Sequence, residues 1–136
     1  MLGNFSYSNP TKLYFGDDAQ KNLSEELKHY GTKVLLTYGS GSIKTNGIYD
    51  EVISALRTAG KEVIELSGVM PNPTTEKLYK GAKIAWENDV DLILAVGGGS
   101  TIDYAKAISV SAWYDGDPWE KFYLKQEDPD SSQRII

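Results

Sequence analysis

The sequence predicts an α/β fold: a doubly wound, mainly parallel sheet with helices on both faces. One observation is that short apolar runs alternate along the chain with amphipathic stretches of helical spacing. The other is that glycine-rich turns follow two of these apolar runs. Because each helix returns the chain to the same end of the sheet, alternating strands and helices indicate parallel pairing.

Three strands are predicted, and each is followed by a turn and a helix. The strands are residues 33–38, 62–66 and 92–96. Apolar residues with helical spacing predict helices over residues 19–30, 48–59 and 100–113, and a further helix before the third strand that carries Leu78, Ala82, Ala85 and Trp86 on one side. We expect Asn72 to be the N-cap of the third helix, with Pro73 at its first position.

The two ends of the chain depart from this alternation. Aromatic and apolar residues on both sides of a proline predict two short strands with a turn over residues 5–15, as an edge hairpin. Residues 115–132 predict an ordered loop or short helical turn and then a mobile stretch. Residues 134–136 resemble the start of another strand, so we expect the chain to be cut there. The aromatic residues near this end predict a core or interface cluster: Trp113, Tyr114, Trp119, Phe122 and Tyr123.

Composition restricts the class of protein. The 136 residues are 40% hydrophobic, enough for one domain with one core. A net charge of −5 argues against nucleic acid or an anionic membrane as the main partner. There is no cysteine, and residues 1–10 lack the pattern of a signal peptide, so a cytoplasmic location is expected.

The turn after the third predicted strand is the strongest candidate site. Gly97, Gly98 and Gly99 follow residues 92–96, and Ser100 opens a helix. Free N–H groups and the positive end of a helix dipole favour an anion at such a turn. Three glycines let the backbone approach a phosphate, although a tight turn without a ligand also fits. Asp103 fits either a capping box with Ser100 or a contact with a ligand hydroxyl or amide.

A second glycine turn follows the first predicted strand. It contains Gly39, Ser40 and Ser42. Its sequence is compatible with a flexible loop and also with a turn that contacts a cofactor. An acidic residue there would accept from a ribose 2′-hydroxyl and repel a 2′-phosphate. This turn has none, and Lys44 is near, so it favours NADP over NAD.

No catalytic set can be placed in the chain. His29 is the only histidine, and it suits the end of a helix better than a catalytic role. One histidine without cysteine cannot build an imidazole or thiolate metal site. The residues alone therefore predict a binding edge, with no catalytic and no metal-ligating residue.

These motifs together resemble the iron-containing (type III) alcohol dehydrogenases, and most of all the butanol dehydrogenase branch. The likeness runs from about residue 5 to residue 136. It rests on four segments in the family's order and spacing: residues 14–16, 38–44, 71–73 and 97–106.

The resemblance implies that residues 1–136 are an N-terminal dinucleotide-binding domain of Rossmann-like architecture. In the family an all-helical domain follows, and this chain lacks it. The matching positions imply a site for NADP or NAD. Gly97, Gly98 and Ser100 would bind the pyrophosphate, with Gly99 in the same turn, and Asp103 would lie near the nicotinamide. Four positions would contact the adenosine ribose or line the cleft: Gly39, Ser40, Ser42 and Asn72.

The implied reaction is reversible hydride transfer between a primary alcohol or aldehyde and the cofactor. A divalent metal, iron or zinc, would be held by one aspartate and three histidines of the helical domain. The full-length enzyme is implied to be a homodimer, and this part alone to be inactive. We also expect an exposed apolar surface where the helical domain docks.

Two other interpretations remain open. The missing catalytic set also fits a stand-alone nucleotide-binding module without catalysis. A glycerol dehydrogenase or dehydroquinate synthase would keep the superfamily and change the substrate, but the butanol-type spacing of the first glycine turn disfavours both.

Overall fold

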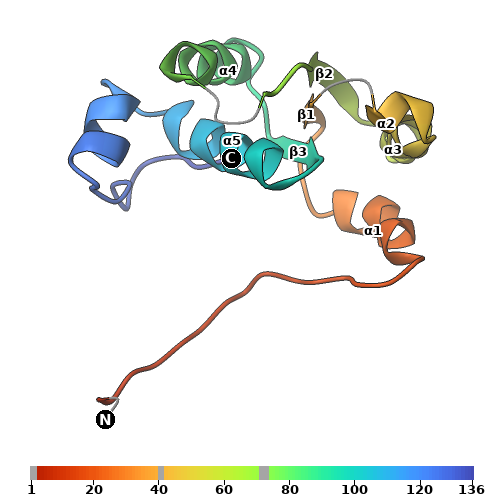
Figure 1. The fold of residues 1–136 in the computed structure, drawn as a ribbon, viewed down its shortest axis with the longest axis horizontal. Helices are drawn as coiled ribbons and strands as arrows, with labels where there is room; N and C mark the ends of the chain where they lie inside the picture. Colours follow the sequence, from red (N-terminus) through yellow and green to blue (C-terminus); the bar gives the residue numbers. More distant parts are fainter. Residues whose placement is uncertain (1–2, 40–41, 71–73) are drawn as a thin grey trace.

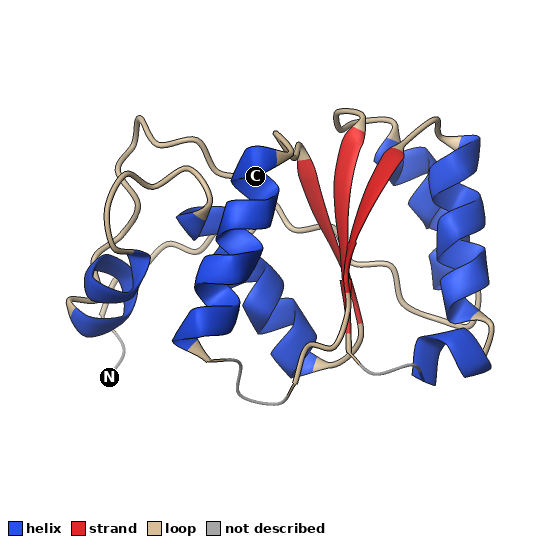
Figure 2. Ribbon diagram, turned by 90° about the horizontal axis from the view of Figure 1, so that it is seen from above, coloured by secondary structure: helices blue, strands red, loops and turns tan. Residues whose placement is uncertain are grey.

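A computed structural model describes residues 3–39, 42–70 and 74–136 of the chain. Its centre is a three-stranded sheet in the order β2-β1-β3, with both pairs parallel. The strands are β1 (Lys33–Tyr38), β2 (Glu62–Leu66) and β3 (Leu92–Val96). Figure 2 shows the sheet between two layers of helices. The predicted fold class is confirmed, and the three predicted strands have the predicted bounds.

One face of the sheet is covered by the helices of the first half of the chain. They are the 3-10 helix η1 (Ala19–Asn22), α1 (Leu23–Leu27), α2 (Ser42–Thr45) and α3 (Ile48–Thr58). Val34 and Leu36 of β1 are fully buried among residues of these helices. The apolar stripe of α3 is therefore buried against the sheet, as its amphipathic spacing predicts.

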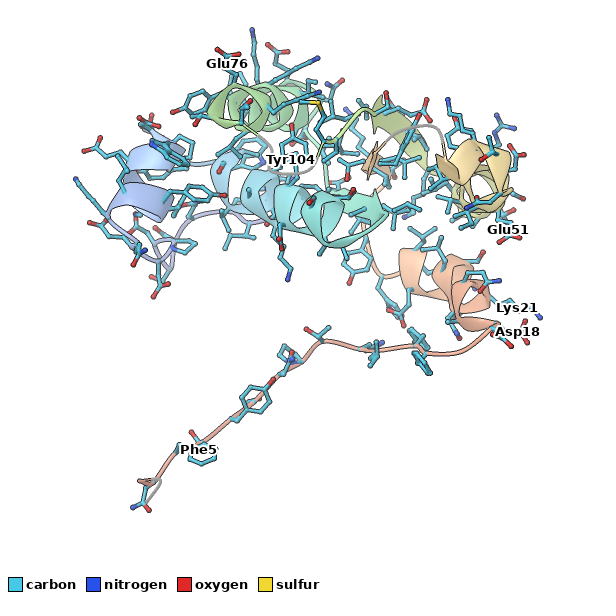
Figure 3. All side chains as sticks on the ribbon, in the orientation of Figure 1. Phe5, Asp18, Lys21, Glu51, Glu76 and Tyr104 are labelled. Carbon is cyan, nitrogen blue, oxygen red and sulfur yellow. The ribbon has the colours of Figure 1, made fainter. Side chains whose placement is uncertain are left out.

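The opposite face is covered by α4 (Thr75–Glu87) and α5 (Gly99–Ser111). Leu35 of β1 points to this side, where it packs in a second core with Tyr104 and Ile108 of α5. Tyr104 lies between the two helices, and its hydroxyl donates to the Lys77 carbonyl of α4 (Figure 3). Alternate residues of β1 thus enter two different cores, which explains why the whole strand is apolar.

The predicted N-terminal hairpin is wrong. Residues 3–15 contain no helix or strand and extend away from the body as a single segment (Figure 1). The Lys12 ammonium and the Tyr14 hydroxyl both bond to the Glu26 carboxylate of α1, at 3.1 and 2.6 Å, and hold the base of the segment. Alternating apolar residues favour a strand, but a strand also needs a partner, and none pairs with this segment in the described part of the chain.

The C-terminal segment also differs from the prediction. The expected short helical turn exists as a π-helix, η2 (Trp119–Leu124), but residues 134–136 do not form a strand. The Ile136 amide donates to the Ser109 carbonyl, and the Gln133 amide group donates to the Val110 carbonyl. This end of the chain therefore packs on α5, and no ladder with β3 forms.

The start of α4 is later than predicted. Thr74 is the N-cap, and its hydroxyl oxygen accepts from the Lys77 amide at 3.3 Å. The helix therefore begins at Thr75, two positions after the expected start at Pro73. Pro73 and the predicted cap, Asn72, lie outside the described residues. In the described ranges, no helix has both the length and the apolar character that crossing a membrane requires.

Candidate functional site

The candidate site lies where the three parallel strands end. The Gly68 amide donates to the Gly39 carbonyl at 2.9 Å, and the Val69 amide donates to the Tyr38 carbonyl at 3.2 Å. Tyr38 is also paired with Val96, the last residue of β3. The turns after β1 and β3 are therefore adjacent, and the segment after β2 is bonded to the first of them, because the carboxyl ends of parallel strands meet at one edge of the sheet.

Gly97 is a glycine that the backbone requires. Its φ is +154°, a conformation that L side chains rarely adopt. A Cβ at this position would lie 2.8 Å from the Thr101 hydroxyl oxygen, which is itself on a buried residue of α5. The first glycine of the turn is therefore explained by local structure alone.

The next two glycines are not explained in this way. Gly98 has an ordinary extended backbone, with φ −85° and ψ −168°. A Cβ on Gly98 or Gly99 would meet no atom of the described residues within 4 Å, and both glycines are exposed. Neither backbone strain nor packing requires glycine there, so the open space above these residues is the feature that a ligand would use.

The same turn provides hydrogen-bond donors. The Gly98 carbonyl accepts from the amides of Thr101 and Ile102, at 3.1 and 3.2 Å, and so begins α5. The amides of Gly99 and Ser100 precede these bonds at the helix N-terminus, and no side chain of the described residues caps the helix. Free amides, a helix dipole and open space together fit the pyrophosphate of a dinucleotide.

Asp103 does not form the predicted capping box. Because Gly98 is the N-cap, Ser100 is already the second residue of the helix, two positions too far along to cap it. Asp103 lies exposed on α5 and lines a hollow of about 170 Å³ with Thr75 of α4 and Tyr123 of η2. Burial, and to a smaller extent the Asp103 charge, raises the pKa of Tyr123. The capping alternative is wrong, and a ligand contact remains a prediction.

The first glycine turn is described only in part. A Cβ on Gly39 would lie 3.3 Å from the Val69 carbonyl oxygen, so the two segments approach closely here. Ser40 lies outside the described residues, and Ser42 begins α2. The predicted contacts of Gly39, Ser40, Ser42 and Asn72 with a cofactor therefore remain predictions.

A cluster that the sequence did not predict adjoins this turn. The Lys44 ammonium lies 5.6 Å from the ring centre of Tyr38 and 4.8 Å from that of Tyr49. The Tyr49 hydroxyl donates to the Glu65 carboxylate at 2.5 Å, which raises the pKa of Tyr49 to about 12. No regular spacing links these residues, because they meet only where α2 and α3 fold back over the end of β1.

The described residues lack the grouped ligands that a metal site requires. In the described ranges, no three His, Cys, Asp or Glu side chains are grouped so that they could hold a metal ion, and His29 is exposed beyond α1. The residues of these ranges therefore do not fit a metal centre.

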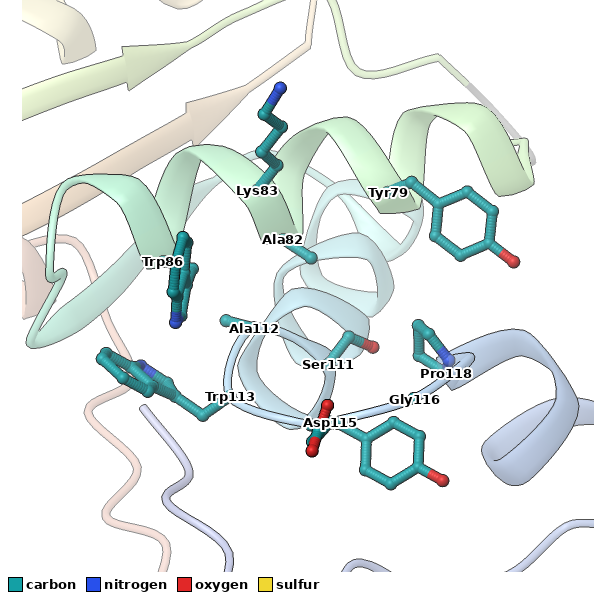
Figure 4. A pocket seen from close by; sticks show the side chains of 11 residues that line it. Tyr79, Ala82, Lys83, Trp86, Ser111, Ala112, Trp113, Asp115, Gly116 and Pro118 are labelled. Atoms are coloured by element: carbon teal, nitrogen blue, oxygen red, sulfur yellow. The ribbon is translucent and has the colours of Figure 1, made fainter.

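A cavity of about 480 Å³ lies between α4 and the segment after α5, lined by Trp86, Trp113 and Asp115 among others (Figure 4). It is at the opposite end of α5 from the glycine turn, and none of the predicted site residues that the structure describes lines it.

The predicted aromatic cluster forms around this cavity and η2. Tyr114 packs on Phe122 with ring centres 5.1 Å apart, and Trp119 stacks on Tyr123 at 5.0 Å. Trp113 contacts Trp86 edge to face at 6.5 Å. The rings therefore pack mainly against one another and against α4.

Comparison with known proteins gives a consistent result. The family model described as iron-containing alcohol dehydrogenase matches residues 10–136. NADH-dependent butanol dehydrogenase B of Clostridium acetobutylicum is 52% identical over 116 residues, which are 85% of this chain and 30% of that protein. NADPH-dependent aldehyde reductase YqhD of Escherichia coli is 42% identical over 120 residues, 87% of this chain and 30% of that protein.

The fold is shared with solved structures. The crystal structure of NADH-dependent butanol dehydrogenase A from Thermotoga maritima superposes with a TM-score of 0.86 at 42% identity, covering 93% of this chain and 32% of that one. The chain spans about a third of the length of the curated relatives that it matches.

Proposed function

The chain belongs to the iron-containing alcohol dehydrogenase family, and from this premise we propose that it is the nicotinamide-cofactor-binding part of a dehydrogenase that interconverts primary alcohols and aldehydes. The observation that carries the proposal is the turn at Gly98 and Gly99. Its glycines are unexplained by backbone or packing, and it opens toward the solvent at the N-terminus of α5. The whole span of residues 1–136 would form this one domain.

In this proposal each segment of the edge has a separate task. The amides of Gly99 and Ser100 bind the pyrophosphate, and the missing side chains of Gly98 and Gly99 let it approach. Gly97 holds the turn in shape over Thr101. Gly39, Ser40, Ser42 and Asn72 surround the adenosine end, and Asp103 contacts a hydroxyl or amide near the nicotinamide. Once bound, the cofactor supplies the hydride chemistry, and this domain orients it.

The rest of the active site lies outside these residues in this proposal. A divalent metal, iron or zinc, is held by an all-helical region that this chain does not contain. A small alcohol or aldehyde of the butanol type is the substrate, since relatives of this chain carry the name butanol dehydrogenase. In this proposal the full-length enzyme is a homodimer in the cytoplasm. The domain by itself is inactive.

The choice between the two nicotinamide cofactors is also a proposal. The relatives that are 46–52% identical are named as NADH-dependent, whereas those at 38–42% are named as NADPH- or NADP-dependent. The turn after β1 begins with Gly39 and has no acidic residue to repel a 2′-phosphate. We therefore propose that NADP binds at least as well as NAD.

The test of the proposed function is a Gly98→Val substitution in the full-length protein. The backbone at Gly98 accepts any residue, and the space around its Cβ position is free, so the variant should fold. The valine side chain would occupy the volume that the pyrophosphate needs. We expect the dissociation constants of NAD and NADP, measured by calorimetry, to rise about tenfold or more.

A Gly3→Val variant is the matched control, because Gly3 also has open space around it and lies far from the site. Unchanged affinity in Gly98→Val would remove the role assigned to this turn. Cofactor binding without turnover of butanol or butyraldehyde by the full-length protein would instead favour a nucleotide-binding module without catalysis.

A further inference from the structure

The Lys44 cluster at the end of β1 holds a positive charge over two tyrosine rings. Lys44 is exposed, and within the described ranges no carboxylate forms an ion pair with its ammonium group. The carboxylate of the cluster, Glu65, accepts the hydrogen of the Tyr49 hydroxyl. The positive charge of Lys44 is therefore available to an anion from outside the chain.

Two aromatic rings restrict the position of the Lys44 ammonium group. The Tyr38 ring belongs to the buried end of the central strand, and it contacts the Tyr49 ring edge to face at 5.8 Å. The Lys44 ammonium lies over both rings, which attract a cation through their faces. Because a flexible lysine is held in this way, less side-chain entropy remains to be lost when it binds an anion.

The cluster is also in the right place for one part of a dinucleotide. Tyr38 directly precedes Gly39, and its strand partner Val96 directly precedes Gly97. An extended ligand with its pyrophosphate at the β3 turn would pass over the end of β1 with its other half. A phosphate monoester carries about −1.5 to −2 charges at neutral pH, so a fixed cation there distinguishes it strongly from a hydroxyl.

We propose that Lys44, held over Tyr38 and Tyr49, is the residue that recognises the 2′-phosphate of NADP and so sets the cofactor preference. This inference rests on the proposed function, because it assumes that a dinucleotide crosses the carboxyl edge of the sheet. It adds to that function a specificity-determining residue that lies outside the glycine turns.

The experiment measures binding to the full-length protein by calorimetry, without catalysis. The ligands are NADP, NAD, 2′,5′-ADP, 5′-AMP and inorganic phosphate. The variants are Lys44→Met, which keeps the side-chain length without the charge, and Lys44→Arg, which keeps a charge that stacks on aromatic rings. Lys83→Met is the matched control, because Lys83 is an exposed lysine on α4. Circular dichroism checks that each variant is folded.

We expect Lys44→Met to weaken NADP and 2′,5′-ADP about tenfold or more, and to leave NAD and 5′-AMP unchanged. Lys44→Arg should restore most of the affinity, and Lys83→Met should change none of it. The difference between wild type and Lys44→Met should shrink as salt concentration rises.

Other outcomes separate the two proposals. If wild type binds both dinucleotides but Lys44→Met changes neither, or weakens both equally, the role of Lys44 is wrong and the proposed function stands. If inorganic phosphate competes as well as 2′,5′-ADP, the site is a general anion site and the inference is overturned. If wild type binds neither dinucleotide, the proposed function fails and this inference fails with it.

Discussion

At the scale of single residues, neighbouring glycines of one turn have different physical reasons to be glycine. Gly97 has a backbone that disfavours any side chain, and Thr101 occupies the space where a Cβ would go. Gly98 and Gly99 have neither constraint. Sequence reasoning treated the three as one motif, since only dihedral angles and neighbouring atoms distinguish them.

This difference predicts different stabilities for single alanine variants. Gly97→Ala should lower the free energy of unfolding by about 1–3 kcal/mol, because it forces a side chain into a strained conformation next to Thr101. Gly98→Ala should change it by no more than about 0.5 kcal/mol, as at an unconstrained surface position. Urea unfolding followed by circular dichroism measures both values. Equal losses in the two variants would show that the fold requires glycine throughout the turn.

At the scale of elements, helix ends were harder to predict than strands. The apolar runs of β1, β2 and β3 determined their own bounds, because each is bordered by polar residues or glycine. The start of α4 depends instead on which of several capping residues bonds to the backbone. Thr74 does so, although Asn72 and Pro73 offered an equally good signal in the sequence.

The cap of α4 can be tested by substitution. Thr74→Ala removes the hydroxyl oxygen that accepts from the Lys77 amide, and should lower the free energy of unfolding by about 1 kcal/mol. Thr75→Ala is the matched control, because its side chain makes no hydrogen bond within the described part of the chain. Thermal and urea unfolding of both variants give the values. A loss in Thr75→Ala as large as in Thr74→Ala would contradict the assigned cap.

At the scale of the whole molecule, the N-terminal segment is the most exposed apolar part that the structure describes. Leu13 is 85% exposed and Phe15 is 97% exposed, and Figure 3 shows Phe5 on the same outstretched segment. Exposed apolar groups in such number are unfavourable in water unless another surface covers them. The exposed segment therefore supports the proposed homodimer.

We expect copies of the purified protein to associate with one another as the protein concentration rises. The N-terminal segment should form the contact between them. A Leu13→Ser/Phe15→Ser variant should weaken this association, since it removes apolar area that a contact would bury. Tyr30→Ser/Ile48→Ser is the control, because it changes two exposed apolar residues of the folded body. Sedimentation velocity measures the association. A wild-type protein that stays monomeric, or equal weakening by both variants, would contradict this prediction.

The sequence by itself determined the strands, their parallel pairing with helices on both faces of the sheet, and the edge of the sheet at which the glycine turns lie. These features depend on local apolar patterns and on the geometry of parallel crossovers, which sequence spacing records. Only the tertiary structure decided three other features. Residues 3–15 have no strand partner among the described residues, residues 134–136 pack on α5, and Lys44 lies over Tyr38 and Tyr49. Each of these depends on contacts between distant parts of the chain, and a local pattern carries no information about whether such a partner is present.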